Sequence, residues 1–358
     1  MIPGILQQDL DAALERSRDL FVELSGARLL ITGSTGMVGT LMLESVAHAR
    51  ARTGADIRVA ALARDARRLH QRLPWIKDAR WIEVAEGDVR SFVPISGAFD
   101  LVVHAANTAS PAEISADPDG IARVVVEGSR HVHDIAAAAG ARRFLQLSSG
   151  SVSGSHFTPA PLIDEDDPGT PEGGSDADRL ARAKAVAERE LLSASGRRAP
   201  AVVFARGFAL AGPWLPLDSD FAFGNFVGAA LAGRSIRVNG DGTPQRSYLY
   251  SRDLVTWLWT LLLRGVPGRA YNVGSEHAVS IGDLARQVAA LVGGTIEIVR
   301  TPALGARAHW HVPNTQRART EFGLEETVTL SEAIVRTAAW WRERLALGSG
   351  APESASSR

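Results

Sequence analysis

Three glycines spaced Gly33-x-x-Gly36-x-x-Gly39 constrain the fold of this chain more than any other feature. The short apolar run 29–31 precedes them, and an apolar helical pattern follows over residues 41–46. This order predicts a strand, a tight turn and a helix. Glycines also make ordinary turns, but a turn between a strand and a helix is the setting of a dinucleotide-binding loop. The stretch therefore predicts a phosphate-binding turn.

Each glycine has a separate physical reason to be there. Gly33 permits the sharp turn, Gly36 lets the backbone approach a pyrophosphate, and Gly39 lets the helix pack closely on the strand. The phosphates would bind free N–H groups at the helix N-terminus, where the helix dipole favours an anion. The predicted cofactor-binding residues of this turn are Gly33, Ser34, Thr35, Gly36, Met37, Val38 and Gly39.

Composition excludes several classes of protein and site. With 358 residues the chain can form one large α/β domain and a smaller second one. A net charge of −1 gives no basic surface for nucleic acid, and the absence of cysteine excludes disulfides and thiolate metal sites. No apolar run is long enough to span a membrane, and the first residues do not resemble a signal peptide. We therefore expect a cytoplasmic protein with neither nucleic acid nor membrane as a partner.

Strands and helices alternate through the first two thirds of the chain, which predicts an α/β fold with a parallel sheet. The expected strands after the first are 57–62, 81–84, 99–103, 143–147 and 201–205. The expected helices are 5–24, 119–139 and 178–192, and the first of these is expected to be a cap packed on the domain.

Beyond residue 213 the alternation becomes irregular. We expect a helix over 221–231, a strand over 246–250, a helix capped by Ser251, a helix from Ser280, a strand near 295–299 and a helix over 330–345. The last residues are small and polar, which predicts a disordered tail.

The end of the second predicted strand bears on the choice of cofactor. An acidic residue commonly stands there and bonds the ribose of NAD, but here the strand ends at Ala63. The following Arg64 could pair with the 2′-phosphate of NADP, or it could be an ordinary solvated arginine at a helix start. Asp88, beside Val89 after the third strand, could accept from an adenine amino group or cap a turn. The cofactor is expected to be NAD or NADP, with a slight preference for NADP.

Two other strand ends carry candidate ligand-binding residues. The fourth strand leads into Ala105, Ala106 and Asn107, where small side chains would let a ligand lie against the backbone. The fifth leads into Ser148 and Ser149, whose hydroxyls would stand where open α/β sheets bind ligands, or could belong to a serine-rich turn.

Together these segments resemble the extended short-chain dehydrogenase/reductase family, in its nucleotide-sugar epimerase/dehydratase branch. The resemblance covers nearly the whole chain. Besides the glycine turn it rests on Gly87-Asp88-Val89, His104-Ala105-Ala106, Ser148-Ser149, Lys184 to Glu188, Arg206, Gly212-Pro213, Asn225, Gly240-Asp241-Gly242, Arg246 to Tyr250 and Tyr271 to Gly274.

The resemblance implies a Rossmann-like, doubly wound parallel sheet with a smaller C-terminal α/β substrate domain. The cofactor and a nucleotide sugar would meet between them. The corresponding division of the chain is an N-terminal helical extension (1–25), an NAD(P)-binding domain (26–212), a substrate-binding part interwoven with it (213–346) and a tail (347–358).

In this family a Ser or Thr, a Tyr and a Lys form the catalytic set, with the Tyr four residues before the Lys. Ser149 and Lys184 match their places, but the Tyr place is Leu180, which cannot accept a proton. The three tyrosines of the chain, Tyr248, Tyr250 and Tyr271, all lie outside the region that could replace it. Lys184, if deprotonated in a desolvated site, or Ser149 through a water molecule, could take the proton instead.

The family's 4,6-dehydratases carry an Asp-Glu pair directly after the catalytic Thr, and here Gly150 and Ser151 stand there. The sequence therefore argues against a standard 4,6-dehydratase. On the substrate side the resemblance implies that Arg246 and Asn225 contact the nucleotide diphosphate, with Asn107 and Ser149 nearer the sugar. No further substrate arginine can be placed around residues 309–314.

The sequence therefore predicts an atypical NAD(P)-dependent enzyme that acts on a nucleotide sugar, with transient oxidation of epimerase type as the leading interpretation. Redox-neutral chemistry on a sugar nucleotide or related metabolite, and a non-catalytic binding protein, remain alternatives. Relatives commonly dimerise through two helices per subunit. The Ala-rich helices near 119–139 and around Lys184 would suit a homodimer, and equally burial inside one subunit.

Overall fold

The computed structural model describes residues 4–93, 97–106, 116–167, 175–194, 199–218, 221–303, 305 and 307–346. Its centre is a seven-stranded sheet in which every pairing is parallel. In spatial order its strands are β3 (Ile82–Glu86), β2 (Arg58–Ala63), β1 (Arg28–Thr32), β4 (Leu101–His104), β5 (Arg143–Ser149), β7 (Ala201–Gly207) and β12 (Ala270–Val273). The strand order reverses beside β1, as in doubly wound nucleotide-binding folds. The predicted fold class is confirmed.

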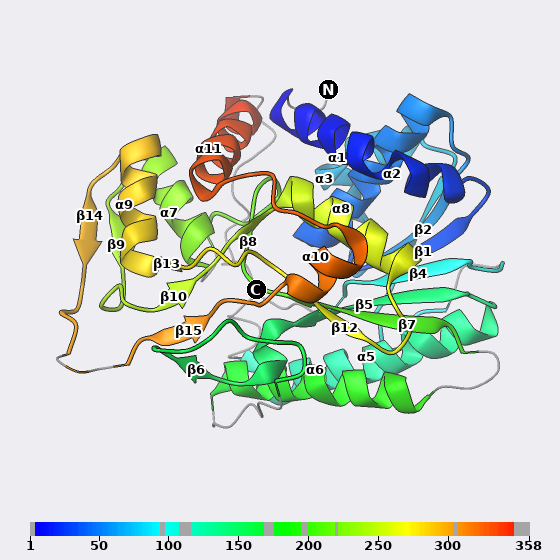
Figure 1. Ribbon diagram of the computed structural model, residues 1–358. Helices are drawn as coiled ribbons and strands as arrows, with labels where there is room; N and C mark the ends of the chain where they lie inside the picture. The colour runs from blue at the N-terminus through cyan, green and yellow to red at the C-terminus, as the bar shows by residue number, and fades with distance from the viewer. Residues whose placement is uncertain are drawn as a thin grey trace.

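Helices cover both faces of this sheet, which is why its inner strands are almost fully buried (Figure 1). The edge strand β3 instead exposes Glu83 and Glu86. Leu29 and Ile31 of β1 belong to the core under helices α1, α2 and α8, whereas Leu30 between them belongs to the core under α5. The covering helices are α1 (Gly4–Glu23), α2 (Met37–Thr53), α3 (Ala66–Arg72), α5 (Pro118–Ala138), α6 (Asp176–Ser193) and α8 (Ser251–Arg264).

The N-terminal helix α1 is a cap built into the core, as the sequence predicts. Phe21 meets Trp259 of α8 edge to face, with ring centroids 5.3 Å apart. The buried carboxylate of Asp9 accepts from the Tyr250 hydroxyl at 2.7 Å and pairs with Arg336 at 2.7 Å. The helix therefore ties the sheet domain to the last helix of the chain.

A smaller lobe lies beside the carboxyl ends of β5 and β7 (Figure 1). It contains a four-stranded sheet in the order β13-β10-β15-β6 and the short parallel pair β14-β9. Its strands are β6 (His156–Phe157), β9 (Ile236–Val238), β10 (Gln245–Arg246), β13 (Val279–Ser280), β14 (Ile296–Ile298) and β15 (His309–His311). Its helices are α7 (Ala222–Leu231), α9 (Ile281–Val292) and α11 (Leu330–Ala346), and α10 (Gln316–Phe322) lies against β12.

Two predictions in this part are wrong. The expected strand over 246–250 is two strands in different sheets, because β10 pairs with β13 and β15 whereas β11 (Leu249–Tyr250) pairs with β8 (Leu210–Ala211). Ser251 does not cap α8. It is the first residue of that helix, Tyr250 holds the capping position, and the Ser251 hydroxyl is buried without a hydrogen-bond partner in the described chain.

The domain division drawn from the sequence stays a proposal. The structure adds that β12 and α8, both after residue 212, pack into the large sheet domain. The predicted tail lies outside the described residues. Within the described ranges no helix combines the length and the apolarity that a membrane span needs.

Candidate functional site

The glycine turn joins β1 to α2 at the carboxyl edge of the large sheet. Gly33 has a φ of +68°, and a Cβ on it would lie 2.6 Å from the backbone carbonyl of Ala105 at the end of β4. A Cβ on Gly39 would lie 2.3 Å from the Gly33 oxygen. The side chain of Ser34 is already used, since its hydroxyl donates to the Ile31 oxygen. The turn therefore requires glycine at 33 and 39 for its own packing.

Gly36 differs from the other two glycines. A Cβ there would meet only the Gly33 oxygen, at 3.3 Å, and the backbone has an ordinary φ of −74°. Gly36 caps α2 without any side-chain hydrogen bond to the first turn. A helix N-terminus with uncapped N–H groups attracts an anion. The turn thus fits the pyrophosphate of a dinucleotide, and Gly36 is the glycine of the three that the packing of the turn does not itself require.

This difference gives a matched pair of variants. Gly36→Ala should leave thermal stability nearly unchanged but weaken NAD binding at least about 10-fold, because the added methyl would stand between backbone and phosphate. Gly39→Ala should lower the free energy of unfolding by about 1–3 kcal/mol, because its methyl overlaps backbone of the turn. Calorimetric unfolding and NAD titration of both variants check this. Equal NAD affinity of wild type and Gly36→Ala would contradict the assignment.

The residues expected around the adenosine part of the cofactor lie beside this turn. Ala105 and Ala106 are half-buried, and the Ala106 N–H donates to the Thr32 hydroxyl at 3.3 Å. Asp88 accepts from the backbone N–H of Arg90 at 2.8 Å and from its guanidinium at 2.6 Å.

The Arg90 guanidinium holds the Asp88 pKa below its usual range, so its carboxylate caps the turn as an ion. Val89 is buried against Gly128 of α5, and Arg64 at the end of β2 is exposed.

Ser149 and Lys184 lie on elements that pack together. Ser149 is the last residue of β5, and its hydroxyl accepts from that of Ser151 at 2.8 Å in the 3-10 turn η2 (Gly150–Ser153). Helix α6, which carries Lys184, packs against both β5 and η2. Lys184 is only 7% exposed, and burial lowers its pKa to about 8, although the Glu188 carboxylate raises it. Glu188 is itself paired with Arg206 at 2.7 Å.

The surroundings of Leu180 are apolar. Its side chain is half-buried and packs on an apolar cluster of Val125, Ala183 and Ala187 between α5 and α6. The space beside η2 is also apolar, because a Cβ on Gly150 would lie 2.1 Å from the ring of Phe208. The structure thus leaves no room for a side chain at 150.

Arg246 of β10 is a half-buried cation without a carboxylate partner. Burial lowers its pKa, and no ion pair in the described chain includes it. Its guanidinium donates to the Gln245 oxygen at 2.8 Å and approaches the His309 Nδ1 at 3.2 Å. Desolvating a cation without pairing it costs free energy. Such a guanidinium is suited to bind an anionic ligand.

The remaining predicted substrate residues have different outcomes. Asn225 is half-buried on α7, and α7 meets the segment after Arg246 through the rings of Phe223 and Tyr248, whose centroids lie 5.3 Å apart. Asn107 lies outside the described residues.

The sequence did not assign a role to the two histidines of β15. His309 contacts Arg246, and the His311 ring stacks on Phe208 with centroids 4.5 Å apart. Their alternate positions in a short strand beside β10 were the available signal, since such residues share one face. Within the described chain no cluster of three or more His, Cys, Asp or Glu side chains could hold a metal ion.

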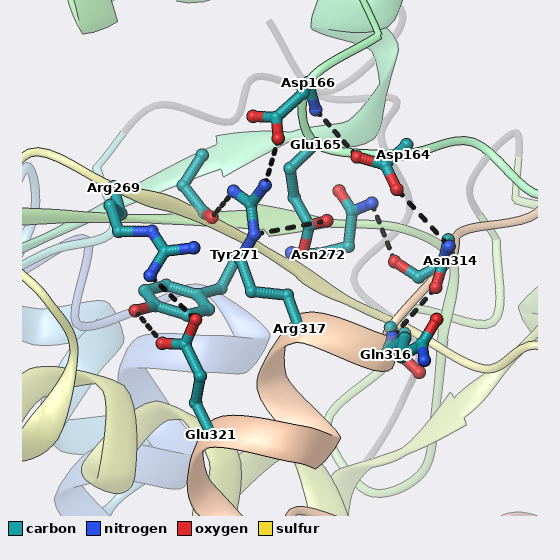
Figure 2. A network of polar contacts seen from close by, with 12 residues as sticks. Asp164, Glu165, Asp166, Arg269, Tyr271, Asn272, Asn314, Gln316, Arg317 and Glu321 are labelled. Carbon is teal, nitrogen blue, oxygen red and sulfur yellow. Dashed lines mark hydrogen bonds and ion pairs between the residues drawn. The ribbon is translucent and has the colours of Figure 1, made fainter.

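A network of hydrogen bonds and ion pairs holds the segment that follows β15 in the chain (Figure 2). The buried Asn272 of β12 donates from its side chain to the oxygens of Ile163 and Asn314, at 2.9 and 3.0 Å. Its backbone N–H donates to Glu165 at 2.8 Å, and Arg317 pairs with Asp166 at 2.5 Å. Figure 2 shows Arg317 between Glu165 and Asp166. This network anchors the segment after His311 to the large sheet.

Comparison with known proteins agrees with this architecture. The family model of the NAD dependent epimerase/dehydratase family matches residues 29–274, more than half of the chain. A UDP-glucose 4-epimerase of Mycolicibacterium smegmatis is 28% identical over 336 residues, which cover 88% of this chain and 99% of that protein. The mouse dTDP-D-glucose 4,6-dehydratase is 26% identical over 226 residues, 62% of this chain, and the match spans 61% of the mouse protein.

Solved structures show the same fold. The dTDP-glucose 4,6-dehydratase DesIV of Streptomyces venezuelae, solved with NAD and TYD bound, superposes with a TM-score of 0.74 at 20% identity. That superposition covers 89% of this chain and 98% of DesIV. The glycine turn, the parallel sheet and the match over residues 29–274 together place this chain in the NAD-dependent epimerase/dehydratase family of enzymes.

Proposed function

We propose that this chain is a nucleotide-sugar-modifying enzyme that works by transient, epimerase-type oxidation of the sugar with NAD or NADP. The observation that carries the proposal is Arg246, a half-buried guanidinium with no carboxylate partner in the described chain. A guanidinium matches the geometry and charge of a diphosphate. Relatives with nucleotide-sugar activities, and a neighbour solved with NAD, support this interpretation.

The chain's own residues divide into a cofactor side and a substrate side. NAD(P), when bound, would supply the acceptor for hydride. The residues proposed to hold it are Gly33 to Gly39, Asp88, Val89, Ala105, Ala106 and Lys184, with Arg64 favouring NADP. Those proposed on the substrate side are Asn107, Ser149, Asn225 and Arg246. Ser149 would hydrogen-bond the reacting oxygen, and Lys184 would hold the nicotinamide ribose. The proton that Leu180 cannot accept was predicted to go to Lys184, or to Ser149 through a water molecule, and these two assignments stay predictions.

The proposal is tested by loading the protein with NAD or NADP and adding UDP-, dTDP-, GDP- and CDP-sugars in turn. The expected result is a rise in absorbance at 340 nm with one sugar nucleotide, followed by return as product forms. Calorimetry with the same ligands measures binding separately. If none of the nucleotides binds, the proposed function is wrong.

A second candidate is redox-neutral chemistry on the same class of ligand. The observation in its favour is the apolar packing of Leu180 and the Phe208 ring over Gly150, which remove two of the family's proton-handling positions. A nucleotide sugar that is converted without any absorbance change, and also with a cofactor analogue unable to accept hydride, would select this candidate.

We also infer a homodimer through α5 and α6. Ala181, Ala183 and Ala187 are buried within one chain, so internal packing already explains these small residues. The outer side of the helix pair nevertheless has a hollow lined by Val126 and Val186. Val186→Glu should convert a dimer to a 38.1 kDa species in light scattering, whereas Val335→Glu, at an exposed position of α11, should not. A wild-type mass of one chain would contradict this inference.

A further inference from the structure

The inner strands of the small sheet bring three nitrogen-bearing side chains together. His311 of β15 is paired in register with Arg246 of β10. His309, two residues earlier on the same strand, places its Nδ1 3.2 Å from the Arg246 guanidinium. A guanidinium can only donate, so His309 Nδ1 accepts and the proton of that neutral ring lies on Nε2. Arg246, which we propose binds the diphosphate, and the imidazoles of His309 and His311 therefore lie on one face of this sheet.

His311 extends this cluster to the carboxyl edge of the large sheet. Its ring stacks on that of Phe208, with centroids 4.5 Å apart and planes at 30°. The Phe208 ring in turn touches Gly150, where a Cβ would approach it to 2.1 Å. Gly150 directly follows Ser149. The Phe208 ring therefore packs between the His311 imidazole and the backbone of Gly150, beside Ser149.

The nitrogens of His311 are available to a ligand. The ring is half-buried, yet neither nitrogen takes part in a hydrogen bond or ion pair within the described chain. Burial, together with Arg246, His309 and His156, lowers the His311 pKa to about 3. The ring is therefore neutral at pH 7, and one nitrogen can accept a proton.

We propose that His311 is the acid/base group of this site, in the role that Leu180 cannot fill. The inference rests on the proposed oxidation of a nucleotide sugar. The O–H bond of the reacting hydroxyl breaks, and its proton goes to the free nitrogen of His311. The C–H bond at the same carbon breaks, and its electron pair leaves as hydride to NAD(P)⁺, which is reduced while the carbon becomes a carbonyl. In the reverse step the imidazolium returns the proton to that oxygen.

The nucleotide itself makes His311 a stronger base. In the free protein the charge of Arg246 opposes protonation of the neighbouring ring. A diphosphate bound to Arg246 would neutralise that charge and add negative charge nearby, which favours the imidazolium. Proton acceptance by His311 would then be easier with the substrate in place than in the free protein.

The first test measures this coupling without turnover. Protein with ¹³C-labelled histidine is titrated with pH by NMR, with and without UDP, and the His311 signal is identified by its loss in His311→Asn. The expected result is a rise of the His311 pKa by at least about one unit with UDP, while UDP does not move the NMR signal of exposed His277 at constant pH. UDP that binds in calorimetry without moving the His311 signal would overturn this inference alone. Absence of UDP binding would instead overturn the proposed function.

The second test uses the nucleotide sugar that wild-type protein converts. His311→Asn should lower kcat about 10²–10⁴-fold and change KM much less, because general acid/base catalysis acts in the transition state. His277→Asn, in the exposed loop before β13, should keep wild-type kcat. Wild-type kcat in His311→Asn would refute the assignment. A folded variant is verified by its unchanged affinity for UDP.

Discussion

Replacing Lys184 by methionine is expected to abolish turnover and at the same time to stabilise the protein. Loss of the amine removes the proposed ribose ligand and would misplace the nicotinamide, so kcat should fall by about 10²-fold or more. Stability should rise because a buried ammonium, 7% exposed, is replaced by an apolar side chain of similar length. Sites used for function commonly hold such destabilising groups.

The gain in stability depends on pH in a defined direction. Burial lowers the Lys184 pKa from 10.5 to about 8, so the unfolded chain binds more protons than the folded one between these values. Wild-type stability therefore rises with pH through this window, and the penalty is fully present below about pH 8. The shift sets an upper bound of about 3 kcal/mol on the gain at pH 7. The difference between variant and wild type should shrink toward pH 10.5.

Chemical denaturation of both proteins at pH 7 and pH 10 measures this effect. The chain has one other lysine, Lys77, which is exposed on the 3-10 helix η1 (Pro74–Asp78), so Lys77→Met is the matched control. That variant should change neither kcat nor the free energy of unfolding. A Lys184→Met protein that is active, or less stable than wild type at pH 7, would show that Lys184 is an ordinary structural residue.

Replacing Arg246 by methionine is expected to weaken the binding of UDP by about 10–100-fold, because a charged hydrogen bond contributes about 1.5–3 kcal/mol. The variant should nearly keep its melting temperature, because loss of the hydrogen bonds to Gln245 and His309 is offset by removal of a desolvated cation without a carboxylate partner. Calorimetric titration with UDP at constant salt measures the affinity.

Arg237→Met provides the control for Arg246→Met. Arg237 lies in β9 of the same lobe but is exposed, so its loss should leave UDP binding unchanged. If Arg246→Met binds UDP like wild type, or unfolds at a much lower temperature, the guanidinium supports the fold and does not bind a ligand.

The sequence determined those features that depend on neighbouring residues. The spacing of Gly33, Gly36 and Gly39 predicted the turn, and the apolar runs predicted every strand of the large sheet except β12, because local patterns set the backbone conformation and the buried faces. The resemblance also predicted that Leu180 stands in the place of the family's tyrosine, and this stays a prediction.

Only the tertiary structure decided which distant residues meet. Residues 246–250 read as one strand, but their ends pair with strands from different parts of the chain. The shortage of partners around Arg246 became visible only once its surroundings were known. His311 stacks on Phe208, whose ring lies against Gly150 beside Ser149, and these residues are far apart in sequence. Such contacts depend on packing between lobes, and local periodicity carries no information about that packing.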